Sequence, residues 1–147
     1  MLSTTKGGPV KVTRNNTPTR KGPAELFTGD VYVDLFAGPP EGNPLTAANV
    51  HFTPGSRTGW HAHAKGQTIW VTEGVGYCQR EGGPIEVIRA GDSVFFEPGE
   101  RHWHGAAPNK FMSHLALQYT EDLTRGPVGE VKHLSDEEYA QAPTVTD

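Results

Sequence analysis

The stretch GWHAHAKGQTIWVTEG, residues 59–74, decides how this chain is interpreted. It carries His61 and His63 two positions apart, followed by Gln67. Successive side chains of an extended strand point to opposite faces of a sheet, so we expect His61 and His63 to share a face. Imidazole nitrogens together with an amide oxygen suit a mid-series divalent metal that keeps room for water or substrate. The stretch therefore predicts part of a metal site on a β scaffold.

A second stretch, GDSVFFEPGERHWHG at residues 91–105, adds further histidines. The predicted metal ligands are His61, His63, Gln67 and His102. His104 has the same strand parity as His102, and His114 lies in the apolar run 111–119. A neutral imidazole beside a metal suits proton transfer near neutral pH, so His104 and His114 are candidate catalytic bases. The alternative is that either one only orients a ligand.

The rest of the chain predicts an all-β protein. Its 147 residues fit one domain with a real core, and its short apolar runs are separated by turns rich in Gly and Pro. Strands this short and evenly spaced favour a sandwich or barrel. The good helix signal comes late, where Ser135 and Glu138 have the spacing of a capping box.

These patterns divide the chain into three parts. We expect a flexible N-terminal segment at 1–22 with a possible short strand at 10–12, a barrel at 23–125, and a C-terminal extension at 126–147 with a short helix near 135–140.

Charge and composition narrow the function classes. The formal net charge is −4, and although residues 1–24 hold five basic and no acidic side chains, they are interrupted by Gly and Pro and contain no aromatic residue. We interpret this segment as a solvated lead-in and expect no nucleic-acid partner. No apolar run is long enough for a membrane span, and the N-terminus lacks the apolar core of a secretory signal. With Cys78 as the single cysteine, we expect a cytoplasmic protein without membrane association.

The two quoted stretches resemble the two sequence motifs of the cupins. This resemblance implies a single-domain jelly-roll β-barrel, a homodimer or higher homo-oligomer, and a metal inside the barrel mouth held by His61, His63, Gln67 and His102. Gln67 stands where most cupins have Glu, and Glu97 stands where the second motif often has Pro. A neutral amide leaves the ion its full double charge, which makes it a stronger Lewis acid.

The strings HxHxxGQT, QREGG, PGERHWHGAAP and MSHLA resemble a narrower bacterial branch of small cupins. That branch includes manganese-dependent (R)-selective hydroxynitrile lyases, and the resemblance implies Mn²⁺ as the cofactor, with Fe²⁺, Ni²⁺ or Zn²⁺ left open. It also implies roles for the extra histidines His104 and His114.

The resulting hypothesis is a metal-dependent lyase that cleaves and forms cyanohydrins, with a histidine as general base and a small molecule as substrate. The predicted substrate pocket comprises Ala48, Val50, Phe52 and Gln118, which share strand faces with the barrel interior. One alternative is a metal-dependent dioxygenase of the quercetinase or diketone-cleaving type. Two others are a non-enzymatic small-molecule-binding cupin and a structural cupin with a vestigial site.

Overall fold

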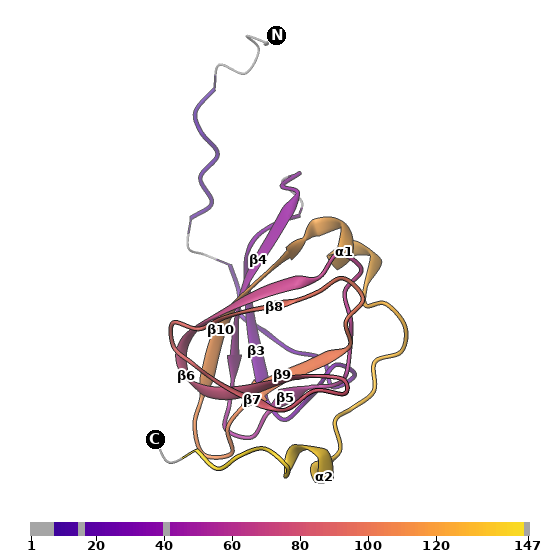
Figure 1. Ribbon diagram of the computed structural model, residues 1–147. Coiled ribbons are helices and arrows are strands. Elements are labelled where there is room, and N and C mark those ends of the chain that lie inside the picture. The colour runs from indigo at the N-terminus through magenta and orange to yellow at the C-terminus, as the bar shows by residue number, and fades with distance from the viewer. Residues whose placement is uncertain (1–7, 15–16, 40–41, 146–147) are drawn as a thin grey trace.

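The computed structural model describes residues 8–14, 17–39 and 42–145. These residues form ten strands and two short helices, and Figure 1 shows how they are arranged. In chain order they are β1 (Arg20–Lys21), β2 (Phe27–Thr28), β3 (Val31–Ala37), β4 (Leu45–Phe52), β5 (Arg57–Thr58), β6 (Gln67–Arg80), β7 (Glu86–Arg89), β8 (Ser93–Phe96), β9 (His102–Ala106), β10 (Met112–Tyr119), α1 (Thr120–Arg125) and α2 (Asp136–Tyr139).

The strands form one curled sheet in the order β1-β3-β4-β10-β6-β9-β5-β2, with β7 and β8 also paired to β6. All of the pairings are antiparallel. β6 joins the two halves of the barrel because its first part pairs with β10 and β8, and its second part pairs with β7 and β9. A single strand thus runs through both walls.

The change of partners along β6 occurs at Gly74. This residue has a φ of 83°, in the left-handed region that side chains other than hydrogen disfavour. A Cβ at this position would lie 1.8 Å from the carbonyl oxygen of Phe111. Glycine therefore allows β6 to bend and lets the chain before β10 approach its backbone.

The barrel interior contains a buried apolar core. Its buried cluster draws on all of the long strands and includes Phe52, Ile69, Phe96 and Met112. The alternation of buried and exposed residues along β4 puts Ala48, Val50 and Phe52 on the interior face, as the sequence predicts. Trp70, by contrast, is 47% exposed on the outer face of β6.

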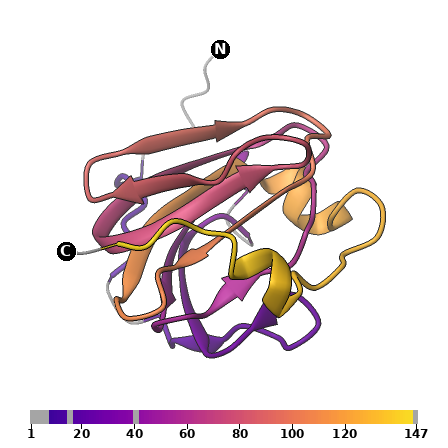
Figure 2. The same cartoon turned by 60° about the horizontal axis from the view of Figure 1, so that its bottom comes forward.

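The C-terminal extension packs back onto the barrel, and Figure 2 shows α2 and the chain after it lying across one face of the sheet. Leu134 and Val145 of this extension join a second buried cluster with Trp60, Tyr77 and Trp103. The contact between the C-terminal extension and the barrel is therefore apolar at its centre.

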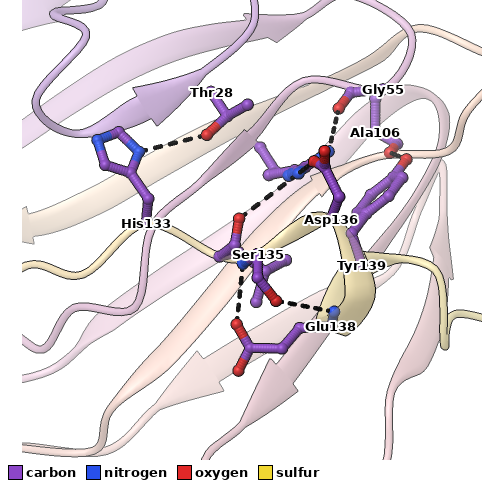
Figure 3. Close-up of polar contacts among 10 residues, drawn as sticks. Thr28, Gly55, Ala106, His133, Ser135, Asp136, Glu138 and Tyr139 are labelled. Atoms are coloured by element: carbon purple, nitrogen blue, oxygen red, sulfur yellow. Dashed lines mark hydrogen bonds and ion pairs between the residues drawn. The ribbon is translucent and has the colours of Figure 1, made fainter.

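Polar contacts hold α2 in place (Figure 3). Ser135 and Glu138 form the predicted capping box, in which the Ser135 side chain accepts from the Glu138 N–H at 3.0 Å. Asp136 pairs with the buried Arg57 at 2.7 Å, and the Tyr139 hydroxyl donates to the Ala106 carbonyl at 2.6 Å.

The all-β architecture and the C-terminal helix are confirmed, while three details differ from expectation. Residues 10–12 form no strand, because they pair with no other segment in the described part of the chain. Arg20–Lys21, inside the segment expected to be flexible, forms β1 against β3. A helix, α1, follows β10 without having been predicted. Residues 1–7 of the N-terminal segment lie outside the described residues.

Neither helix in the described ranges is long and apolar enough to cross a membrane.

Candidate metal and substrate site

Antiparallel pairing brings the two histidine-bearing segments together. The N–H of His61 donates to the His102 carbonyl at 3.0 Å, and the N–H of His102 donates to the His61 carbonyl at 2.9 Å. The two imidazole rings therefore lie side by side, with centroids 4.3 Å apart, and the His63 ring is 5.0 Å from that of His61. The sequence predicted that an extended strand would carry His61 and His63, but His61 lies in an isolated bridge to His102 and His63 in no strand. The tertiary fold brings the three rings together.

Backbone carbonyls orient two of these rings. Nδ1 of His61 lies 2.8 Å from the Gly59 carbonyl oxygen, and Nδ1 of His102 lies 2.8 Å from that of Glu100. A carbonyl oxygen only accepts, so each Nδ1 carries the proton and each Nε2 keeps a free lone pair. Metal-ligating histidines are commonly fixed in this way.

Gln67 is held so that its amide oxygen is free. Its Nε2 donates to Oε1 of Gln118 at 2.9 Å, and its Oε1 is buried without a hydrogen-bond partner. Nε2 of His63 and Nε2 of His102 are likewise buried and unpartnered. Buried polar atoms are normally satisfied, so this set of lone pairs fits a bound divalent ion well.

The structure also brings His104 into the cluster. Among the His, Cys, Asp and Glu side chains of the described ranges, potential ligand atoms of His61, His102 and His104 lie within 4.8 Å of one another. His63 is not part of this group. The structure therefore places His104 beside two of the four predicted ligands, His61 and His102.

Burial keeps these imidazoles neutral. It lowers the pKa of His102 to about 4, against the opposing effect of the Glu100 carbonyl. It also lowers the pKa values of His61 and His104 well below the usual range. Burial lowers the pKa of His63 as well, although the charge of Asp122 and the nearby Gln67 side chain oppose it. Neutral imidazole is the form that binds a metal.

His104 and His114 form a hydrogen-bonded pair. Nδ1 of His104 lies 3.1 Å from Nε2 of His114. The other nitrogen of each ring, Nε2 of His104 and Nδ1 of His114, is buried without a hydrogen-bond partner. Burial lowers the pKa of His114 to about 4. The ring of Phe52 packs against both, at 5.8 Å from His104 and 5.3 Å from His114. The pair is thus a short proton path beside the candidate metal ligands.

A cavity of about 470 Å³ opens onto this cluster. Of the predicted pocket residues, Ala48, Val50 and Gln118 line it. Phe52 does not, because it lies deeper in the barrel as a fully buried support behind the two histidines. Strand parity identifies the face that a residue shares but not its depth along the barrel axis.

Several cavity residues were not predicted from the sequence. Val33 and Leu35 come from β3, and Asp122, Leu123 and Pro127 come from α1 and the loop after it. The alternation of β3 could have indicated the first two. Nothing local marks Asp122, which stands in the polar string TEDLTR and is nevertheless only 1% exposed.

Comparison with known proteins identifies the family to which this sequence is similar. The cupin domain family matches residues 48–115, which span β4 to β10. An (R)-mandelonitrile lyase from Granulicella tundricola is 50% identical over 119 residues, covering 81% of this chain and 89% of that protein.

Solved structures support the same fold. A cupin-like protein from Thermotoga maritima matches with a TM-score of 0.76 and 36% identity, covering 83% of this chain and 91% of that one. The polyketide cyclase RemF from Streptomyces resistomycificus, at 19% identity, matches in fold alone with a TM-score of 0.69, over 92% of this chain and 95% of that one.

Proposed function

Because the chain belongs to the cupin family, we propose that it is a metal-dependent lyase that cleaves and forms cyanohydrins. The observation that carries the proposal is the convergence of unpartnered nitrogen and oxygen atoms with a histidine pair at an apolar cavity. Half of the aligned residues are identical to those of a protein named (R)-mandelonitrile lyase, which supports the same reaction class.

The proposed ligands are His61, His63, Gln67 and His102, and the proposed ion is Mn²⁺, with Fe²⁺, Ni²⁺ and Zn²⁺ as alternatives. When bound, the ion would supply Lewis-acid stabilisation to the negative charge that develops on the cyanohydrin oxygen. All four side chains are neutral, so they leave that stabilisation undiminished.

In the cleavage direction, the unpartnered Nε2 of His104 accepts the proton of the cyanohydrin hydroxyl group. The hydrogen bond to His114 shares the resulting positive charge between two rings. The carbon–carbon bond then breaks, its electron pair leaves with cyanide, and the oxygen becomes the aldehyde carbonyl. The proton returns from the histidine pair to cyanide, so that aldehyde and HCN are the products.

The cavity wall would hold the organic group of the substrate. Val33, Leu35, Ala48 and Val50 present apolar side chains, and a volume of about 470 Å³ accommodates an aryl group. Apolar surroundings also exclude water, which strengthens every electrostatic interaction inside. We therefore propose aromatic cyanohydrins as substrates.

A mandelonitrile cleavage assay on the Mn²⁺-loaded protein, run with and without oxygen, tests the proposal. We expect benzaldehyde release that is indifferent to oxygen, abolished by chelation and abolished by His61→Ala. His133→Ala serves as a matched control because His133 is exposed and bonds to Thr28 away from the cavity. Full cleavage by a metal-free His61→Ala protein would refute the proposal. Oxygen uptake with a flavonol or diketone, without benzaldehyde release, would favour the dioxygenase.

A further inference from the structure

Asp122 is a carboxylate in α1 that is buried and that bonds to a residue outside its own helix. It is only 1% exposed, and carboxylates are rarely this buried unless they are paired. Its Oδ2 accepts a hydrogen bond from the backbone N–H of Lys65 at 2.7 Å. Lys65 is 57 residues away in sequence, and the contact links α1 to the first histidine motif.

Lys65 lies in the turn between two candidate metal ligands, His63 and Gln67. The Gly66 N–H donates to the His63 carbonyl at 3.2 Å, and the Gly99 N–H donates to the same carbonyl at 2.9 Å. These bonds hold one side of the turn. The Lys65 N–H belongs to no strand ladder, and the Asp122 carboxylate holds it from the other side.

The chain after α1 holds the other side of His63. The N–H of Val128 donates to the carbonyl of Ala62 at 2.9 Å, between His61 and His63. The region of α1 therefore contacts the backbone on both sides of the His63 imidazole. It also forms part of the cavity wall, through Asp122 and Leu123.

The carboxylate contributes charge as well as a hydrogen bond. Its Oδ1 is buried without a hydrogen-bond partner, and the Arg125 guanidinium is 3.6 Å away. Both His63 and Gln67 line the same cavity as Asp122. Asp122 therefore has two roles that mutation can separate. It accepts a hydrogen bond from the Lys65 N–H, and it places a negative charge near the neutral candidate ligands His63 and Gln67.

We propose that Asp122 is a positioning residue, whose bond to the Lys65 N–H holds the turn that presents His63 and Gln67 to the metal. This inference rests on the proposed metal site but not on the reaction. Residues that orient metal ligands commonly change metal affinity by about 10- to 100-fold when they are removed. The acceptor is the essential feature, so asparagine should replace aspartate.

Mn²⁺ affinity, measured on the full chain by competition with a chelator, tests the proposal. We expect Asp122→Ala to bind Mn²⁺ about ten-fold more weakly or worse, and Asp122→Asn to restore affinity to within about three-fold of the parent. Hydrogen exchange of the Lys65 amide should quicken in Asp122→Ala by about ten-fold or more, while the Ile69 amide in β6 stays protected. If Asp122→Ala does not fold, Asp122→Leu keeps the side-chain volume and removes the acceptor.

Glu121→Gln is the matched control. Glu121 is the neighbouring carboxylate, and it pairs with the exposed Nζ of Lys65 at 2.6 Å rather than with the backbone N–H. Its replacement should leave Mn²⁺ affinity unchanged. Unchanged affinity in both Asp122→Ala and Asp122→Leu would overturn the proposal, as would an Asp122→Asn protein as weak as Asp122→Ala. A parent protein that binds Mn²⁺ but releases no benzaldehyde would contradict only the proposed function.

Discussion

Gln118 on β10 determines which end of the Gln67 amide faces the histidine cluster. Oε1 of Gln118 accepts from Nε2 of Gln67 at 2.9 Å, so the Gln67 oxygen, and not its nitrogen, is the atom left unpartnered among the imidazoles. An amide nitrogen donates hydrogen bonds and is no ligand for a cation, whereas the oxygen is. The contact between these two glutamines therefore decides whether Gln67 is competent as a ligand.

Replacement of Gln118 by alanine should weaken Mn²⁺ binding by about ten-fold, because the Gln67 amide is then free to rotate. Gln118→Glu keeps an acceptor at the same place and should bind the ion nearly as well as the parent protein. Calorimetric titration of the metal-free proteins measures both affinities. Equal affinity in Gln118→Ala and the parent would show that Gln67 is oriented by something else.

The histidine pair should matter for the reaction more than for metal binding. We expect His114→Gln to slow mandelonitrile cleavage by about 100-fold or more, since it removes the partner that shares the proton with His104. Mn²⁺ content, measured by elemental analysis, should remain that of the parent. His51→Gln is a suitable control, because His51 bonds to Asp34 and Ser113 and does not line the cavity. Loss of the metal together with activity in His114→Gln would assign the residue to metal binding instead.

Acid should destabilise the metal-free protein. Burial lowers the pKa values of His102 and His114 from 6.5 to about 4 in the folded state, whereas both regain ordinary values on unfolding. Between these values the unfolded chain binds protons that the folded chain does not, so the free energy of unfolding falls as pH falls. The slope is about 1.4 kcal/mol per pH unit for each histidine. Urea denaturation at a series of pH values measures it. A profile without slope below about pH 6 would contradict these pKa values.

Cys78 should be inert in the native protein. It is 5% exposed within the core, and burial, with the nearby acidic side chains of Glu86 and Asp92, raises the pKa of its thiol to about 12. The thiolate is the reactive form, so its population near neutral pH is negligible. Alkylation by iodoacetamide, followed by mass spectrometry, should proceed at least about 100-fold more slowly in native protein than in urea. Comparable rates would indicate that β6 opens readily.

Much of the candidate site could be predicted because the sequence patterns that mark it are local. The spacing within GWHAHAKGQ and ERHWHG predicts His61, His63, Gln67 and His102 as candidate metal ligands without knowledge of the fold. Strand parity correctly assigned Ala48, Val50 and Phe52 to the interior face of β4. It did not show that Phe52 lies outside the cavity wall, because parity gives the face of a strand and not the depth of the residue within a barrel.

The sequence by itself thus determined the candidate ligand types, the all-β class and the capped C-terminal helix, each of which depends on neighbours within a few positions. Only the tertiary structure decided how those candidate ligands are held. The contacts of Gln67 with Gln118 and of Lys65 with Asp122 join residues 51 and 57 positions apart. Such contacts depend on the register of β10 against β6 and on where α1 begins, which are set by the packing of the whole barrel and by no local pattern.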